Sequence, residues 1–152
     1  MWFSRKQIVK SPDGKVGCQP AGSSVPLMTT KRLGDAAETT ALNHLVKAGM
    51  KLVETNYRTP GRGGGEIDLI MRAKDGTLVF IEVRQRSGKS HGGAGASISG
   101  VKQQRIIFAA RHYLMRFASP PPCRFDVVLV QGPSGISAAV ELEWLQAAFD
   151  AS

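Results

Sequence analysis

The sequence predicts an α/β domain in which a mixed central sheet is flanked by helices. Its 152 residues, with 42% hydrophobic content, are enough for one domain with a core of its own. Apolar residues recur at helical spacing in some segments, whereas shorter segments alternate or run together as strands do. These segments follow in the order α-β-β-β-α-β without an internal repeat, an order that is typical of a mixed sheet covered by helices.

The N-terminal segment is rich in Gly, Pro, Ser and Lys and has no periodic apolar pattern. This composition predicts a flexible tail over 1–29 and places the folded domain at 30–152. Met28 lies at the end of the tail, so the sequence leaves open whether the natural chain starts at Met1 or at Met28.

The first helix is predicted over 31–48, because its apolar side chains recur every three or four residues and share one face. These side chains are Leu33, Ala37, Ala41, Leu45 and Ala48. Gly49 follows as a typical stop signal. Glu38 lies beside the apolar stripe, where it could reach the sheet, and the alternative for it is an ordinary solvated position.

Three strands are predicted next, over 50–58, 66–73 and 77–85. The segment 59–65 (TPGRGGG) is a turn-rich break between the first two strands. Lys74-Asp75-Gly76 predicts a tight hairpin turn between the second and the third.

The second half of the chain starts with a Gly- and Ser-rich loop over 87–100. A second helix is predicted over 101–117, with Ser99 as its candidate N-cap. The nearly all-apolar segment 125–131 predicts a strand that is buried on both faces. The segment 141–149 is interpreted as a short terminal helix.

The hairpin turn determines which side chains of its two strands lie opposite each other. A three-residue loop with Gly76 in the left-handed conformation is expected, whereas a two-residue loop would shift the register. Directly opposite side chains have Cβ atoms about 4.5–5.5 Å apart. Counting outward from a three-residue loop gives the pairs Ala73–Thr77, Ile70–Phe80, Asp68–Glu82 and Glu66–Arg84. The positions expected on the other face, in a core, are Ile67, Leu69, Val79, Ile81 and Val83.

Asp68 and Glu82 are the candidate metal-binding residues. Like charges directly opposite each other destabilise a sheet, and a divalent cation between them would remove the repulsion. Mg²⁺ is typically held by one or two carboxylates, waters and substrate phosphates, and such an ion can activate water for phosphodiester cleavage. We therefore expect Mg²⁺ or Mn²⁺ as the cofactor. The alternative is that both residues simply face solvent on a half-exposed sheet.

The chain is strongly basic, with 20 Lys and Arg against 12 Asp and Glu, a net charge of +8 and a pI near 9.9. This surplus favours a polyanionic partner such as nucleic acid. The candidate nucleic-acid-binding residues are Arg58, Arg62, Arg84, Arg86, Lys89, Lys102 and Arg105.

The second helix has a mostly basic stripe at helical spacing, opposite an apolar one. The stripe consists of Lys102, Arg105, Ala109, His112 and Arg116. Such cations neutralise phosphates without reading base sequence. The alternative is the solvated face of an ordinary amphipathic helix.

Cys18 and Cys123 form no CxxC pair and lie near no histidine cluster, which argues against a disulfide framework or a zinc site. No apolar stretch is long enough to cross a bilayer, and no apolar region follows the basic N-terminal residues as in a secretory signal. We therefore expect a cytoplasmic protein without a membrane partner.

Several motifs form one ordered set: Gly34-Asp35-x-Ala37-Glu38, Gly65-Glu66-Ile67-Asp68-Leu69-Ile70, Val79-Phe80-Ile81-Glu82-Val83-Arg84, Lys102 at a helix start, and Arg124-Phe125-Asp126-Val127-Val128. In this order they resemble the YraN family of uncharacterised bacterial proteins. That family is similar to archaeal Holliday-junction resolvases and to the PD-(D/E)xK nuclease superfamily. The resemblance covers residues 31–131 and implies the restriction-endonuclease-like fold.

The resemblance also implies roles for three acidic residues. Asp68 matches the first metal-binding acid of the superfamily, and Glu82 matches the acid of the (D/E)xK element. Glu38 matches the helix glutamate that helps to hold the metal or its waters in resolvase-like members.

Arg84 departs from the pattern, which has Lys at that position. Arginine is effectively always protonated, so it can clamp a phosphate or stabilise a transition state but cannot act as a base. Gln85 and Lys102 are the candidate substitutes. We favour Lys102, because a helix N-terminus is a good phosphate site.

The expected function is a metal-dependent endonuclease acting on structured or branched DNA, as in repair or recombination, with RNA left open as a substrate. By analogy with junction resolvases, a branched substrate would favour a homodimer. The alternative, suggested by Arg84, is a catalytically weak or inactive nucleic-acid-binding module that keeps the nuclease fold.

Overall fold

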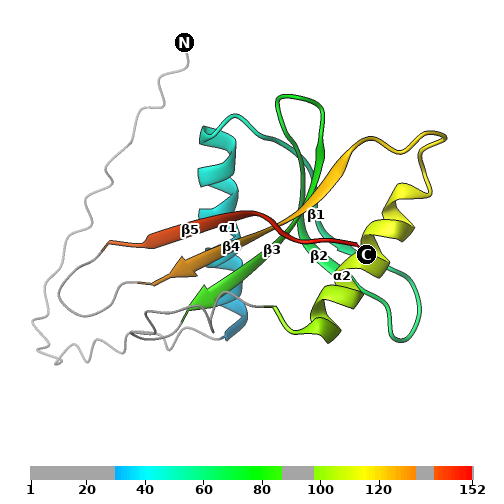
Figure 1. The fold of residues 1–152 in the computed structure, drawn as a ribbon. Coiled ribbons are helices and arrows are strands. Elements are labelled where there is room, and N and C mark those ends of the chain that lie inside the picture. Colours follow the sequence, from blue (N-terminus) through cyan, green and yellow to red (C-terminus); the bar gives the residue numbers. More distant parts are fainter. Residues whose placement is uncertain (1–29, 87–97, 133–138, 152) are drawn as a thin grey trace, which may run out of the picture.

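The computed structural model describes residues 30–86, 98–132 and 139–151. These residues form two helices and one five-stranded sheet (Figure 1). In chain order the elements are α1 (Thr30–Lys47), β1 (Lys51–Arg58), β2 (Glu66–Arg72), β3 (Leu78–Arg86), α2 (Gly100–Leu114), β4 (Cys123–Gln131) and β5 (Glu141–Phe149). The predicted α/β class and the first six elements are confirmed. The predicted tail over 1–29 lies outside the described residues.

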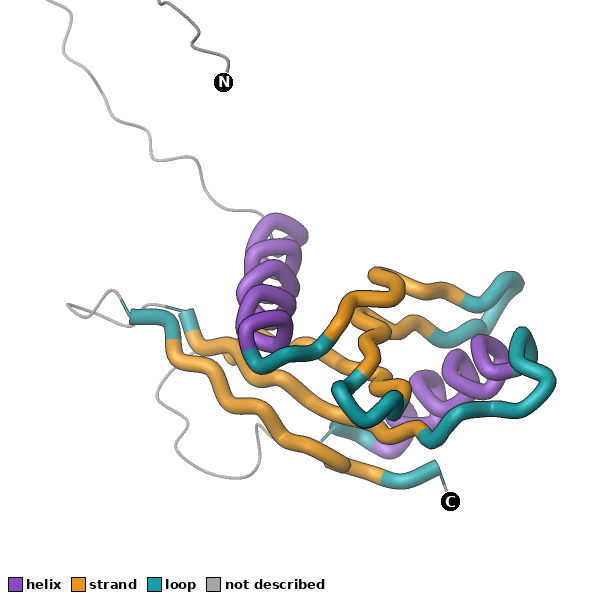
Figure 2. The backbone as a smooth tube through the Cα atoms, turned by 90° about the horizontal axis from the view of Figure 1, so that it is seen from above, coloured by secondary structure: helices purple, strands orange, loops and turns teal. Residues whose placement is uncertain are grey.

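The strands lie side by side in the order β1-β2-β3-β4-β5. Strands β3 and β4 run parallel, because α2 connects them, and all other neighbours run antiparallel. The sheet is covered by α1 on one face and by α2 on the other (Figures 1 and 2). No helix among the described residues has the length and apolar character needed to cross a bilayer.

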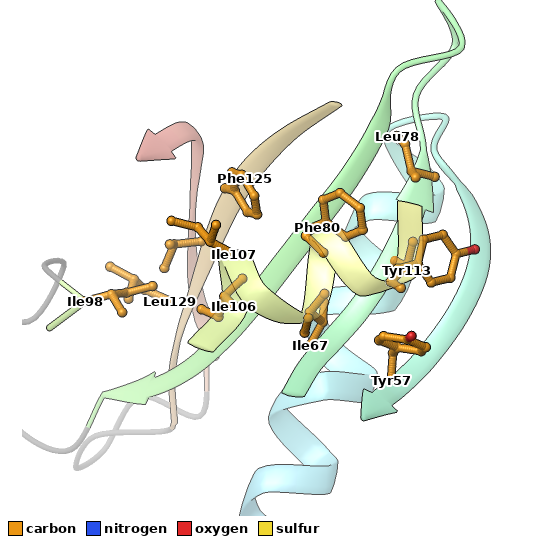
Figure 3. Close-up of a cluster of buried hydrophobic side chains, with 14 residues drawn as sticks. Tyr57, Ile67, Leu78, Phe80, Ile98, Ile106, Ile107, Tyr113, Phe125 and Leu129 are labelled. Carbon is orange, nitrogen blue, oxygen red and sulfur yellow. The ribbon is translucent and has the colours of Figure 1, made fainter. Parts of the chain in front are cut away.

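Two hydrophobic cores lie on opposite faces of the sheet. The core under α2 contains Phe80, Ile106, Tyr113 and Phe125, together with other apolar residues of β1–β4 (Figure 3). The core under α1 contains apolar side chains of α1, β2, β3 and β4, such as Leu45. Because β3 and β4 contribute to both cores, their sequences are nearly continuous apolar runs.

The C-terminal segment is a strand, so the prediction of a terminal helix over 141–149 was wrong. As β5 it pairs antiparallel with β4 and covers the edge that β4 would otherwise leave open. Its apolar side chains divide between the faces: Trp144 packs against the α1-side core, and Leu145 and Phe149 pack against the α2-side core. This two-sided burial is typical of a strand, although the spacing of its apolar residues also fits a helix.

Candidate functional site

The hairpin between β2 and β3 brings the two candidate metal ligands together. Its three-residue loop ends at Gly76, which has a φ of +91°. Regular pairing runs from this loop to Leu69 and Ile81, so Asp68 and Glu82 are the next opposite positions. The predicted register of the hairpin is confirmed from Ala73 and Thr77 to Ile70 and Phe80, whereas the predicted pair of Glu66 and Arg84 lies beyond the regular ladder.

Asp68 lies where the ladder between β2 and β3 opens. Its Oδ2 accepts a hydrogen bond from the backbone N–H of Val83 at 2.8 Å. The residues before and after Asp68 belong to different cores: Ile67 packs under α2, and Leu69 packs under α1. The prediction that Ile67 and Leu69 share a face was therefore wrong, because the strict alternation of β2 is interrupted at Asp68.

Asn56 of β1 is the site residue that the sequence reasoning missed. It lies opposite Asp68 in the register of β1 and β2 and has a φ of +51°. Asn adopts this left-handed conformation more readily than most residues. Its side chain lies near Glu38 of α1 and acts to lower the pKa of that carboxyl. The only signal in the sequence was an Asn inside an otherwise strand-like segment.

Glu82 is almost completely buried, with 9% of its side chain exposed. Its Oε1 lies 3.2 Å from the Nζ of Lys102. Its Oε2 has no hydrogen-bond partner among the described residues. Burial and then the charge of Asp68 raise the pKa of Glu82 to about 8, although Lys102 acts in the opposite direction.

Lys102 reaches Glu82 from the first turn of α2. The Ser99 Oγ accepts the backbone N–H of Lys102 at 3.3 Å, so the predicted N-cap is confirmed. Position 84 of β3 is Arg, yet an amine still lies beside Glu82, because the docking of α2 brings Lys102 there.

The other two acidic residues are affected by the same surroundings. Burial is the main cause that raises the pKa of Asp68. Partial burial and then the charge of Asp68 raise the pKa of Glu38, although the side chain of Asn56 has the opposite effect. The charge of Asp68 therefore acts on both Glu38 and Glu82.

The donor set fits an ion that needs few protein ligands. Within the described residues, no three acidic, imidazole or thiol groups lie close enough to hold a metal by themselves. Mg²⁺ commonly takes one or two carboxylates and completes its shell with waters and phosphates. The buried and unpartnered Oε2 of Glu82, beside Asp68, is the observation that fits such an ion.

The glycine-rich loop between β1 and β2 holds α2 close to the sheet. Thr59 and Gly65 close the loop, since the Thr59 Oγ1 accepts the Gly65 N–H at 2.7 Å and the Thr59 N–H donates to the Gly65 carbonyl at 3.0 Å. A Cβ added at Gly65 would lie 1.9 Å from the backbone oxygen of Arg105. Only glycine therefore allows α2 to approach β2 this closely.

Some of the predicted nucleic-acid-binding residues are exposed. These are Arg58, Arg62, Arg84 and Arg105, and Lys102 is partly exposed beside Glu82. Lys89 lies outside the described residues.

Two ion pairs differ from the predicted arrangement. The Nη2 of Arg58 lies 2.8 Å from the Oε1 of Glu66. Glu66 therefore pairs with β1 and not with Arg84, because the regular ladder to β3 has already ended. Arg86 is mostly buried and lies 3.5 Å from the carboxylate of Glu143 on β5.

The basic stripe predicted for α2 is only partly a surface. Ala109 is fully buried, and the ring of His112 is hydrogen-bonded to the hydroxyl of Tyr57. The guanidinium of Arg116 lies 3.7 Å from the ring centre of Tyr113 and forms an ion pair with β1. The middle of the stripe therefore faces the sheet, whereas Arg105 and Arg116 at its two ends remain exposed.

Asp126 of β4 has a structural role that the motif did not reveal. It is fully buried, and its carboxylate accepts hydrogen bonds from Arg124 Nε at 3.0 Å, Trp144 Nε1 at 2.9 Å and the Ala147 N–H at 3.0 Å. Two of these donors belong to β5. Asp126 therefore fixes the edge strand to the sheet.

The chain is similar to many proteins of one family. The model of the uncharacterised protein family UPF0102 matches residues 37–130, more than half of the chain. A UPF0102 protein of a Polaromonas species is 69% identical over the full length of both chains. A second, from Polaromonas naphthalenivorans, is 66% identical over the full length of both. A UPF0102 protein of an Acidovorax species is 59% identical over 85% of this chain and 92% of its own. The chain therefore belongs to the UPF0102 family, the YraN family that its ordered motifs resemble.

Proposed function

We propose that this chain is a divalent-metal-dependent nuclease that cleaves phosphodiester bonds in structured or branched DNA. The observation that supports this function most is the pair Asp68 and Glu82, two neighbouring carboxylates, one half-buried and the other almost completely buried, in a protein with a net charge of +8. Burying two like charges is costly unless a cation or a proton compensates them.

Asp68 and Glu82 would hold Mg²⁺ or Mn²⁺, which would supply Lewis-acid stabilisation of the phosphate and a water that ionises more easily. Glu38 adds a third acidic group from α1 on the Asp68 side of the site. Asn56 would act as a positioning residue, because its side chain lies near Glu38 and favours the charged form of that carboxyl.

Lys102 is the residue that would meet the phosphate. Its ammonium lies beside Glu82 at the N-terminal end of α2, where positive charge stabilises the negative charge that develops on phosphate oxygens. Arg84, which is exposed on the same strand as Glu82, can clamp a phosphate but cannot accept a proton.

The second candidate function is a nucleic-acid-binding module without turnover. It is favoured by the ion pair of Lys102 with Glu82, which already neutralises one of the acids. It is also favoured because, among the described residues, no three acidic, imidazole or thiol groups lie close enough to hold a metal. The DNA affinity of this module would depend on salt and would not change when a chelator is added.

Cleavage assays on the full chain distinguish the two functions. Labelled single strands, duplexes, flaps and four-way junctions, each as DNA and as RNA, are incubated with Mg²⁺, with Mn²⁺ or with EDTA. We expect metal-dependent cleavage of a branched DNA that Asp68→Asn and Glu82→Gln abolish. The control Glu143→Gln removes the same charge from the exposed edge strand and should cleave normally.

Thermal unfolding with Mn²⁺ provides a readout besides activity. A ligand that binds the folded chain raises its stability as its concentration increases. The natural chain and Glu143→Gln should therefore be stabilised by Mn²⁺, and Asp68→Asn should not. If no substrate is cleaved and Mn²⁺ stabilises none of the proteins, the nuclease function is excluded and the binding module remains.

A further inference from the structure

A depression lies on the exposed face of α2, the helix whose first turn also carries Lys102 of the proposed site. Its volume is about 590 Å³, within the usual range for ligand pockets. Residues of the first three turns of α2 line it together with Gly63 of the glycine-rich loop. The proposed site itself lies elsewhere, at Asp68, Glu82 and the inner side of Lys102.

The depression exposes an aromatic ring between positive charges. Phe108 is 54% exposed and Val101 is 70% exposed, although both belong to a helix whose other face is well packed. Arg105 and Arg111 line the same depression, together with the amide of Gln104. None of the described residues that line the depression is acidic.

Both arginines have donors to offer a ligand. Among the described residues no acid pairs with Arg105. Arg111 donates from one nitrogen to the carbonyl of Ala151 at 3.1 Å, and this single bond leaves most of its five N–H donors available. A ligand that fits this depression would therefore have a flat apolar part that contacts Phe108 and negative charge that contacts the two guanidinium groups.

We propose that this depression binds an unpaired nucleotide of the nucleic acid, with its base stacked on Phe108 and the flanking phosphates on Arg105 and Arg111. Bases that leave a duplex commonly stack on aromatic side chains in this way, with basic residues following the backbone. The proposal rests on the proposed function only in that the ligand is a nucleic acid. It adds that the substrate has a single-stranded segment beside the phosphate held at the metal site.

The location of the depression supports this occupant. Lys102 and Arg105 lie one turn apart on α2, so phosphates of one strand could contact both. Gly63 belongs to the loop that leads into β2 and Asp68. A second copy of this chain fits less well, because a symmetric contact through this face would bring the arginines of both copies together.

Binding is measured by fluorescence anisotropy in EDTA, so that no cleavage occurs. The probes are a labelled single-stranded DNA and a blunt duplex of matched length. Phe108→Ala should weaken single-strand binding about 5- to 100-fold, the effect of losing one stacked base, and should leave duplex binding nearly unchanged. Phe108→Tyr should restore it, and Phe108→Leu should not.

Met115→Ala is the matched control, since Met115 is a 79% exposed apolar residue at the C-cap of the same helix but outside the depression. It should bind both probes normally. Arg105→Gln and Arg111→Gln should each reduce the salt dependence of single-strand binding by about 0.7 in the log–log slope. All these residues are exposed, and circular dichroism will show that the variants remain folded.

The other outcomes overturn the proposal. Equal loss of binding in Phe108→Ala and Met115→Ala, or no loss in either, excludes a stacking site. A dimer that Phe108→Ala dissociates, with DNA binding unchanged, would assign this face to a second copy. The nuclease function is tested separately from this binding site. Asp68→Asn should lose cleavage but keep single-strand binding in EDTA.

Discussion

Replacing Glu82 by Gln should change how the stability of the metal-free protein depends on pH. Burial and the charge of Asp68 raise the pKa of Glu82 from 4.5 to about 8. The folded protein therefore holds this proton more tightly than the unfolded chain does. The resulting stabilisation is complete below pH 4.5 and is lost as the pH rises toward 8. Gln stays neutral at every pH, so the Glu82→Gln variant should not lose stability from this cause as the pH rises.

The expected size follows from the pKa shift. A change from 4.5 to about 8, at about 1.36 kcal/mol per unit, corresponds to about 5 kcal/mol in the free energy of unfolding. About 3 kcal/mol of this stabilisation is already lost at pH 7. Gln also loses the ion pair with Lys102, which shifts the stability of the variant at all pH values. The test therefore lies in the slope against pH and not in the stability at one pH.

The assay is urea unfolding in EDTA at several values between about pH 5 and pH 8. The free energy of unfolding of Glu82→Gln relative to the natural chain should increase by about 3 kcal/mol across this range. Glu143→Gln, from the exposed edge strand, serves as the control and should follow the natural chain. Histidines are common to all three proteins and cancel in the comparison. If the free energies of unfolding of Glu82→Gln and the natural chain change with pH in parallel, the raised pKa of the buried Glu82 is refuted.

Three further predictions test the site and its support. Gly65→Ala should lower the free energy of unfolding in urea by about 1–3 kcal/mol, because its Cβ would meet the backbone of α2, whereas Gly34→Ala, where a Cβ meets nothing within 4 Å, should raise it by about 0.5–1 kcal/mol. Asp126→Ala should lower the free energy of unfolding by about 3–5 kcal/mol and speed hydrogen exchange in β5, because buried donors lose their acceptor. Unchanged exchange in β5 would contradict the role of Asp126 in fixing this strand to the sheet. Lys102→Met should raise the pKa of Glu82 further, so the stabilisation by Mn²⁺ should begin at a higher pH than in the natural chain; an onset at the same or a lower pH would contradict the ion pair.

Local sequence patterns were sufficient for the hairpin that carries the two acids. A loop ending in glycine determines the register of the strands that follow it, so Asp68 and Glu82 could be placed opposite each other by counting from Gly76. The buried strand β4 and the N-cap at Ser99 were equally local, since each depends on a short run of residues.

Features that depend on packing partners could not be read in this way. The segment 141–149 is compatible with both a helix and a strand, and the open edge of β4 with the buried carboxylate of Asp126 decided for the strand. The interruption of β2 at Asp68 lies opposite Asn56, a residue of another strand that adopts a positive φ.

The sequence by itself determined the α/β class, the acidic pair, the basic surplus and the family. Only the tertiary structure placed the amine of Lys102 beside Glu82, turned the middle of the basic stripe of α2 toward the sheet, and left Phe108 exposed between two arginines. The physical reason is that periodicity shows which residues share a face of a helix, whereas the close contact at Gly65 determines how that helix docks and which face meets solvent.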